Sequence, residues 1–255
     1  MKGKITIIGS GNVATHLASA FINRGFEIVQ VFSRNIENAT VLANSVEAEA
    51  IDDLSLLNNS SDLYIISVSD SAINDVLAKM PNVDGIVVHT AGSVGIEMLN
   101  RFNQYGVFYP FQTFTKEKEI DFKTIPLLVE GSTDEILKYL KEIASQLSEN
   151  VIKADTFQRK NVHLSAVFAS NFVNHLYSVA DKLLNSNGIS FDILAPLIRE
   201  TTEKALSMNP VNAQTGPAQR EDFNIIDNHL DILKNSQNEF DIYKLLTESI
   251  ISYKK

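Results

Sequence analysis

The feature that most constrains this chain lies at its start, where a β-branched run leads directly into a glycine-rich turn. Residues 4–8 read Lys-Ile-Thr-Ile-Ile, and Gly9-Ser10-Gly11-Asn12-Val13-Ala14 follows. A buried strand brings the chain to a sheet edge, Gly9 permits a tight turn, and Gly11 lets a pyrophosphate approach the backbone. The next helix presents free N–H groups to the phosphates. This order predicts a dinucleotide site, whose contacts we assign to Gly9, Ser10, Gly11, Asn12 and Val13.

Composition places the chain among globular proteins with a sizeable core. Its 255 residues are 44% hydrophobic and 21% charged, which suits one large domain or two ordinary ones. The net charge of −9 argues against a nucleic-acid or anionic-membrane surface, because either needs a basic field. The chain has no cysteine, and no run resembles a signal sequence or a membrane span. We expect a cytoplasmic protein without nucleic-acid or membrane partners.

Two stretches with different hydrophobic periods divide the chain. Up to residue 154, short apolar runs alternate with amphipathic segments, whereas the pattern after Asp155 is helical. We expect an α/β fold class, with a doubly wound, mostly parallel Rossmann sheet in residues 1–154 and an all-helical domain in residues 155–255. The predicted strands are Lys4–Ile8, Glu27–Phe32, Ala48–Ala50, Leu63–Val68, Gly85–His89, Gly106–Tyr109, Pro126–Val129 and Val151–Lys153. The predicted helices are Val13–Arg24, Ile36–Asn44, Ser71–Lys79, Gly95–Asn103, Asp134–Ser148, 156–187, 190–207, 219–234 and 239–252.

The end of the second predicted strand indicates which dinucleotide binds. An acid there would accept hydrogen bonds from the ribose 2′-OH of NAD and would repel a 2′-phosphate. This strand ends Phe32-Ser33-Arg34 and has no acid. Ser33 can donate to a phosphate oxygen and Arg34 can pair with it, so we predict NADP, with NAD less favoured. The alternative is that Ser33 caps the next helix and Arg34 is a solvated turn residue.

The strand that ends at Val68 runs into Ser69-Asp70-Ser71 at the carboxyl edge of the sheet, beside the first strand. The ribose and nicotinamide of a dinucleotide pass this edge. We therefore predict that Val68, Ser69 and Asp70 contact the cofactor. The alternative is that Asp70 or Ser71 only caps the following helix.

Three further segments carry a family resemblance. They are residues 89–93 (His-Thr-Ala-Gly-Ser), 109–114 (Tyr-Pro-Phe-Gln-Thr-Phe) and 215–222 (Thr-Gly-Pro-Ala-Gln-Arg-Glu-Asp). With the long helix that includes residues 159–175, they resemble the Rossmann-like NADP oxidoreductases that carry the C-terminal domain of unknown function 2520. That family is related to the 6-phosphogluconate and β-hydroxyacid dehydrogenases, pyrroline-5-carboxylate reductases and ketopantoate reductases. The resemblance implies an NADP-linked oxidoreductase, with histidine in many members where this chain has Tyr109. A phenol is a poorer general base than imidazole near pH 7, but it still donates a hydrogen bond.

The predicted helix 156–187 carries a polar stripe on an otherwise apolar surface. A polar stripe on a buried helix needs polar partners or a wet cleft. The related hydroxyacid dehydrogenases present Lys and Asn to the substrate from such a helix. By this resemblance Lys160 and His163 are predicted acid–base residues, and Asn171 and Asn174 would orient the substrate. The alternatives are a solvated face or dimer contact, and an interior hydrogen-bonded role for His163. The stripe consists of Lys160, His163, Ser170, Asn171, Asn174 and Ser178.

Four residues are predicted to bind the substrate: His89, Ser93, Tyr109 and Arg220. His89 ends a strand and Ser93 follows it in a glycine-containing loop whose N–H groups suit a carboxylate. In the resembling family the segment around Arg220 closes over the cleft, so Arg220 is a candidate anchor for a substrate carboxylate. The alternatives are a turn with a capping serine at residues 89–93 and a surface ion pair for Arg220. We expect no metal, because the sequence has no metal-binding motif.

These features predict an NADP-dependent dehydrogenase or reductase that acts on a small polar carbonyl, hydroxy or imino compound between the two domains. One alternative is a non-catalytic NADP-binding sensor or protein-interaction module, which the departure at Tyr109 favours. Another is electron exchange between NADP and a deazaflavin in a wide, apolar cleft. The long apolar faces of the helical domain predict a homodimer.

Overall fold

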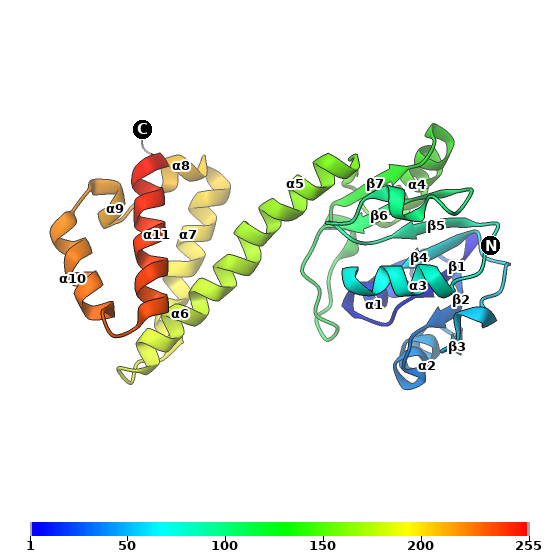
Figure 1. Cartoon of the computed structure of the whole chain (residues 1–255), viewed down its shortest axis with the longest axis horizontal. Helices are drawn as coiled ribbons and strands as arrows, with labels where there is room; N and C mark the ends of the chain where they lie inside the picture. Colours follow the sequence, from blue (N-terminus) through cyan, green and yellow to red (C-terminus); the bar gives the residue numbers. More distant parts are fainter. Residues whose placement is uncertain (1, 254–255) are drawn as a thin grey trace. The chain divides into compact units, whose positions relative to one another are not determined.

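The computed structural model describes residues 2–253, which divide into two compact units. Unit 1 extends to Val167 and holds a sheet with helices on both faces, and unit 2 starts at Phe168 and is helical (Figure 1). The outermost ends of the two predicted domains, residues 1, 254 and 255, lie outside the described residues. The predicted α/β fold class is confirmed.

Eight strands form one sheet in the order β3-β2-β1-β4-β5-β6-β7-β8. All neighbouring strands are parallel except β6 and β7, which pair antiparallel. No α-helix crosses between β6 and β7 within the described chain, so β7 starts at the sheet edge where β6 ends and runs back. All eight predicted strands are confirmed: β1 Lys2–Ile8, β2 Phe26–Phe32, β3 Glu49–Ile51, β4 Leu63–Ile66, β5 Ile86–His89, β6 Tyr105–Pro110, β7 Leu127–Gly131 and β8 Val151–Lys153.

Two hydrophobic clusters cover the two faces of this sheet. One contains the apolar sides of α1, α2 and α4, and the other contains the apolar side of α3. Helix α4 shows the local cause, because the Thr133 side chain caps its first turn and its buried residues recur at helical spacing. The helices of unit 1 that pack on the sheet are α1 Asn12–Ile22, α2 Ile36–Ser45, α3 Ile73–Lys79 and α4 Asp134–Leu147.

The predicted helix Gly95–Asn103 is wrong, because only a short 3₁₀ turn, Ile96–Leu99, forms there. The backbone of this segment is engaged by the start of α5. Ile96 N donates to Thr156 Oγ1 at 3.2 Å, and Val94 O accepts from the Arg159 guanidinium. Contacts with α5 therefore hold the start of this segment.

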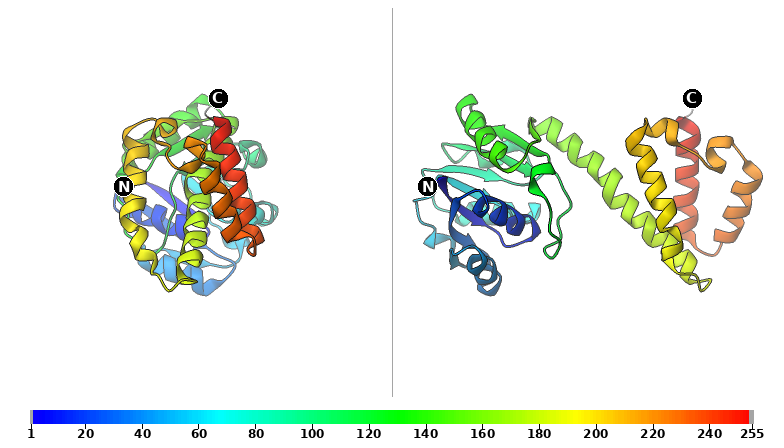
Figure 2. Two further views of the ribbon diagram at one scale, coloured as in Figure 1. Left: turned by 90° about the vertical axis from the view of Figure 1, so that its left-hand side faces the viewer. Right: turned by 180° about the vertical axis from the view of Figure 1, so that it is seen from behind.

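Unit 2 consists of helices connected by short turns, and Figures 1 and 2 show α11 beside α9 and α10. The predicted helix 219–234 is interrupted, because Glu221 adopts a left-handed conformation with φ 56°. Asp222 then caps a new helix by accepting from Ile225 N at 3.4 Å. The remaining helices are α5 Thr156–Ala166 in unit 1, followed by α6 Val173–Asn185, α7 Ala195–Ser207, α8 Pro210–Ala213, α9 Pro217–Arg220, α10 Phe223–Leu233 and α11 Gln237–Tyr253.

The predicted helix 156–187 forms as one run, but it differs from the expectation in two ways. Residues Val167–Phe172 are π-helical, so a wheel of constant 100° per residue does not hold across them. The apolar residues, which we expected to be buried, are largely exposed in the single chain, with Phe157 at 76% and Phe168 at 62%. The expected burial is therefore wrong for this chain taken alone.

Candidate functional site

A cleft of about 1240 Å³ opens in unit 1 at the carboxyl ends of the parallel strands. The turn after β1 and the loops after β2, β4 and β5 line it, together with the end of β6 and one residue of α5. Twelve of the residues predicted for the site line this cleft: Gly9, Ser10, Gly11, Asn12, Val13, Ser33, Arg34, Val68, Ser69, Asp70, Tyr109 and His163.

The glycine turn has the geometry that a dinucleotide requires. Gly9 has φ +132°, and a Cβ built there would lie 2.0 Å from Ser67 O, so the fold itself demands glycine. Gly11 differs, because a Cβ there would meet no protein atom within 4 Å. Gly11 also begins α1, whose first turn has no side-chain cap and no acid. The open space and the uncapped helix start fit a pyrophosphate.

The loop between β6 and β7 runs beside the start of α1 and is fastened to it. Asn12 Nδ2 donates to Phe114 O at 2.7 Å, and a ring nitrogen of His16 lies 2.9 Å from Thr115 O. The His16 and Phe114 rings are also in contact, with centroids 5.0 Å apart. The Asn12 side chain therefore holds this loop in place at the mouth of the cleft.

The end of β2 places Ser33 and Arg34 in the cleft as predicted. Ser10 Oγ donates to Ser33 Oγ at 3.0 Å, so Ser33 is joined to the glycine turn. The capping alternative for Ser33 is wrong, because Asn35 caps α2 by accepting from Glu37 N at 2.8 Å. Arg34 is exposed on the cleft wall.

Four charged residues of the cleft lining were not predicted: Asp52 and Asp53, which follow β3, and Asp75 and Lys79 on α3. Asp53 accepts from Ser55 N at 2.9 Å, and this hydrogen bond holds the pKa of Asp53 below its usual value, with a smaller contribution from Lys79. Only the fold brings these residues together, because Asp75 and Lys79 lie on α3 and the other two acids follow β3.

The loops after β4 and β5 are joined across the cleft floor. Ser93 Oγ donates to Asp70 Oδ2, and Thr90 Oγ1 donates to Ser67 Oγ at 3.3 Å. Asp70 therefore binds the neighbouring loop and does not cap a helix, while its side chain still faces the cleft. Ser93 supports Asp70 and does not itself line the cleft.

Tyr109 on β6 and His163 on α5 form a hydrogen-bonded pair inside the cleft. Tyr109 Oη lies 3.1 Å from His163 Nδ1, and both side chains are partly buried. A Cβ on Gly92 would lie 2.7 Å from His163 Nδ1 and 2.8 Å from Tyr109 Cζ, so Gly92 leaves room for the pair. Burial raises the pKa of the Tyr109 phenol, Asp70 raises it further, and the charge of Arg159 opposes both. The neutral phenol is therefore favoured.

His89 lies elsewhere than predicted. Its side chain is fully buried beneath the cleft, and its Nδ1 accepts from Ala91 N at 3.2 Å. Burial, aided by the positive charge of Arg159, lowers the pKa of His89 to about 4. A neutral imidazole with no exposed surface supports the loop after β5 and does not line the cleft.

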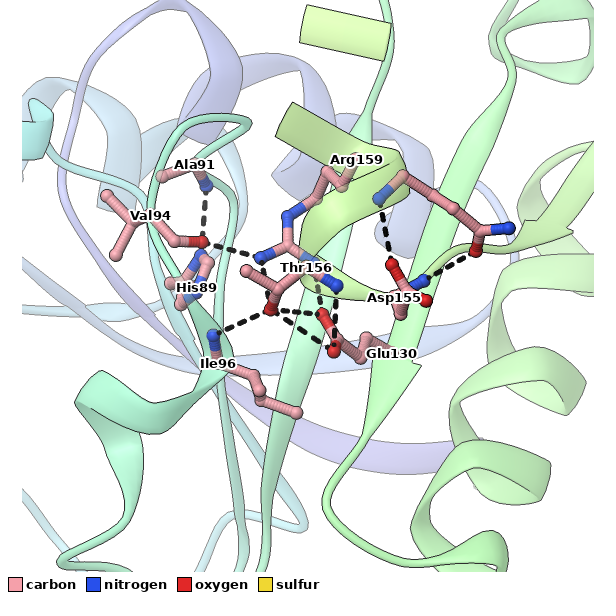
Figure 3. A network of polar contacts seen from close by, with 9 residues as sticks. His89, Ala91, Val94, Ile96, Glu130, Asp155, Thr156 and Arg159 are labelled. Carbon is pink, nitrogen blue, oxygen red and sulfur yellow. Dashed lines mark hydrogen bonds and ion pairs between the residues drawn. The ribbon is translucent and has the colours of Figure 1, made fainter. Parts of the chain in front are cut away.

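A buried ion pair next to His89 fixes the start of α5 (Figure 3). Arg159 has no exposed side-chain surface and pairs with Glu130 on β7. Glu130 also accepts from Thr156 N at 3.0 Å, and Arg159 Nη2 donates to Val94 O at 2.5 Å. The pair therefore connects β7, α5 and the loop after β5.

The remaining predicted residues have exposed side chains. Lys160 is on α5 and does not line the cleft. Asn171, Asn174 and Arg220 belong to unit 2. Their roles toward a substrate stay predictions.

Neither a metal site nor a membrane-spanning helix is found within residues 2–253. No group of three or more His, Cys, Asp or Glu side chains lies close enough to hold a metal ion there. None of the described helices has the length and apolar character to cross a membrane.

Comparison with known proteins agrees with this arrangement. Residues 4–106 match the family described as NADP oxidoreductase, coenzyme F420-dependent, and residues 125–250 match the domain of unknown function 2520. A protein from Bacteroides fragilis, provisionally named an NADP oxidoreductase, is 46% identical over 98% of both chains, with a TM-score of 0.91. The chain belongs to this family of NADP oxidoreductases. None of the curated proteins searched matches it.

More distant solved structures share the same fold. A reductive aminase from Aspergillus terreus in complex with NADPH is 17% identical over 99% of this chain and 95% of its own, with a TM-score of 0.74. The 1-pyrroline-5-carboxylate reductase of Streptococcus pyogenes is 14% identical over 98% of both chains, with a TM-score of 0.62. At these identities the likeness shows the fold shared by the NADP oxidoreductase family and these enzymes.

Proposed function

We propose that this chain binds NADP(H) in the cleft of unit 1 and reduces or oxidises a small polar carbonyl, hydroxy or imino compound. The observation that carries the proposal is the Tyr109–His163 pair, which lines the same cleft as the glycine turn. When bound, the nicotinamide would supply or accept a hydride. Such a transfer needs a group that gives or takes a proton at the heteroatom of the substrate.

The pair supplies that group through its hydrogen bond. Tyr109 keeps its phenol proton, because burial raises its pKa, and the imidazole of His163 shares this hydrogen bond through Nδ1. A proton that one ring gives to the heteroatom is passed to it from the other ring, and the pair then regains a proton from water in the cleft. The resemblance implies a histidine at the position of Tyr109 in many family members, and the imidazole of His163 beside Tyr109 supports an active enzyme over an inactive module.

The remaining cleft residues bind and orient the cofactor. The turn at Gly11 and the start of α1 would hold the pyrophosphate, while Ser33 and Arg34 would hold a 2′-phosphate. Asp70, whose side chain is fixed by Ser93, lies on the side of the cleft toward Tyr109 and would border the ribose of the cofactor. We retain NADP over NAD because the side chains at the end of β2 are a hydroxyl and a guanidinium.

Fluorescence titration with NADPH and NADH tests the cofactor assignment. We expect tighter binding of NADPH, and Arg34→Ala should remove about 10- to 100-fold of that preference, as expected for a lost charge-assisted hydrogen bond. Gly11→Ala should weaken both cofactors without loss of stability, because its Cβ meets only open space. Equal affinity for the two cofactors in the native chain would contradict the NADP assignment.

Turnover tests the reaction. NADPH oxidation should be measured with a panel of carbonyl and imino compounds, and NADP reduction with hydroxy compounds. Tyr109→Phe and His163→Gln should each lower kcat by about 100-fold while NADPH still binds, because general acid–base catalysis contributes on this scale. Retained turnover in His163→Gln would contradict the role of the pair, and cofactor binding without any turnover would favour a sensor.

The name of the matched N-terminal family favours a second candidate, hydride exchange between NADP and a deazaflavin. A flat deazaflavin needs a wide, apolar reaction site, whereas Asp70, Tyr109 and His163 make this end of the cleft polar. Loss of the absorbance of the oxidised deazaflavin on addition of NADPH, which would give it a hydride, would support this candidate over the first.

A further inference from the structure

Two polar assemblies lie close together in unit 1. The reactive pair is Tyr109 with His163, and we name the second assembly the clamp. The clamp consists of Glu130, Thr156 and Arg159, with the backbone groups of Val94 and Ile96. Figure 3 shows the clamp at the start of α5, with Thr156 between Glu130 and Ile96.

The clamp and the pair are joined through three parts of the fold: helix α5, the neighbouring strands β6 and β7, and the loop after β5. On α5, Arg159 and His163 are four residues apart and so lie on one face of the helix. In the sheet, Glu130 on β7 pairs with Val107 on β6, two residues before Tyr109. Side chains two apart on a strand, and those directly opposite on an antiparallel neighbour, share one face, so Glu130 and Tyr109 do too.

The loop after β5 is the third of these parts. Gly92 packs against both rings of the pair, and Val94, two residues on, accepts from the Arg159 guanidinium at 2.5 Å. Ile96 N, two residues further, donates to Thr156 Oγ1 at 3.2 Å. A shift of α5 along β7 would therefore displace His163 from Tyr109 and move Gly92 at the same time.

The energetics of the clamp also favour a geometric role. Removing an arginine and a carboxylate from water costs about as much as their attraction returns, so a buried ion pair adds little net stability compared with apolar packing. The ion pair instead fixes how its partners are oriented, because the planar guanidinium donates hydrogen bonds only in fixed directions. Arg159 uses two of its nitrogens on partners from two elements, Glu130 and Val94.

We propose that the clamp is a positioning device that sets the register of α5 and thereby holds His163 against Tyr109. Glu130, Thr156 and Arg159 are positioning residues, and none of them lines the cleft. The inference rests on the proposed function only for the catalytic role of the Tyr109–His163 pair. The position of the His163 ring can be measured without any substrate.

The test uses the full chain and one matched pair of variants. Thr156→Val removes the hydroxyl that joins Ile96 and Glu130 and keeps the shape of the side chain, while Thr156→Ser keeps the hydroxyl. Glu130→Gln removes the charge opposite Arg159. Glu239→Gln breaks the ion pair of Glu239 with Lys182 in unit 2 and serves as the control.

The first readout is the nitrogen NMR signal of His163 Nδ1, assigned with His163→Gln. Tyr109→Phe gives the signal of the ring without its phenol partner. We expect Thr156→Val and Glu130→Gln to move the signal most of the way to that value, and adding Tyr109→Phe to either should cause little further change. Thr156→Ser and Glu239→Gln should keep the native signal. If Glu130→Gln does not fold, Thr156→Val with Thr156→Ser decides the question.

The second readout is turnover. We expect Thr156→Val to lower kcat by about tenfold with KM and NADPH affinity within about twofold of native, because a displaced proton donor affects the reaction more than binding. The proposal would be overturned if Thr156→Val and Glu130→Gln lowered the stability of the protein but left the His163 signal at its native value. If the signal responds but no compound is turned over, the proposed function fails while the positioning device stands.

Discussion

The two units of this chain differ in how they bury their apolar side chains. Unit 1 closes two clusters around its sheet, whereas only Ala218, Ile226, Leu233 and Glu239 are buried among residues 168–253. Large apolar side chains of unit 2 stay open, including Leu206 at 84% and Ile232 at 75% exposure. Helices on both faces of a sheet bury the apolar side chains of the sheet together with their own. A few helices with apolar sides need another layer of structure to bury those sides. Unit 1 therefore has a closed core of its own, and we propose that unit 2 completes its core against a second copy of the chain.

The largest contrast between the units should appear at two glycines with positive φ. Gly9→Ala drives a Cβ to within 2.0 Å of a backbone oxygen, whereas Gly188→Ala, at φ +69°, meets no atom within 4 Å. We expect Gly9→Ala to cost about 4 kcal/mol of unfolding free energy and Gly188→Ala about 1 kcal/mol. Urea unfolding measures both. Equal losses of unfolding free energy in the two variants would show that the backbone around Gly9 accommodates a Cβ more easily than the short distance to Ser67 O indicates.

Acid should destabilise unit 1 through His89. This group has a pKa of about 4 when folded and 6.5 as its ordinary value, so between those pH values only the unfolded chain binds the proton. Its contribution is complete above pH 6.5 and is lost as the pH falls toward 4, by about 3 kcal/mol in total.

His89→Gln should therefore flatten the pH dependence of the unfolding free energy over that range. The comparison is best made as a difference from the native chain, because other groups also titrate there. An identical profile in His89→Gln would contradict the buried neutral imidazole.

A homodimer would explain the open apolar faces of unit 2. Phe168 and Phe172 lie in edge contact, with ring centroids 5.1 Å apart, and are 62% and 49% exposed. If a second copy covers them, Phe168→Glu should weaken association by about 100-fold, as for a central aromatic contact. Val41→Glu, at an exposed apolar site of unit 1, should not. Sedimentation equilibrium gives the masses, and a monomeric native chain at micromolar concentration would rule the dimer out.

The smallest contrast concerns helix caps. Thr133 accepts from Ile136 N at 3.3 Å and caps the long helix α4, which packs on the sheet. Asn209 caps the four-residue helix α8 in unit 2. We expect Thr133→Ala to cost about 1 kcal/mol and Asn209→Ala less than about 0.5 kcal/mol. Thermal unfolding followed by circular dichroism measures the difference, and a larger cost for Asn209→Ala would reverse it.

Much of unit 1 follows from local patterns in the sequence. Each strand is a short apolar run, and Gly9 and Gly11 mark where the first one turns, so strands and cofactor turn are predictable one at a time. The gathering of Gly11, Arg34 and Asp70 in one cleft is also predictable, because parallel strands bring their carboxyl ends to the same edge.

Contacts between distant segments were not predictable in this way. Tyr109 and His163 are 54 positions apart, and no periodicity links the end of a strand to one turn of a helix. Gly92 shows its role only through the Cβ that would clash with both rings. The π-helical residues Val167–Phe172 were not predictable either, because an extra residue in a turn has no local sequence signal. The constant 100° per residue of a helical wheel therefore fails across them.

The sequence by itself determined the dinucleotide turn, the βαβ rhythm and the change to helices after Asp155, because these depend on residues close together in the chain. The tertiary structure alone decided that His89 is buried, that Arg159 holds α5 to β7, and that Tyr109 meets His163. The physical reason is that burial and pairing are properties of the whole packed chain, and the same histidine is a buried support or a proton carrier according to what surrounds it.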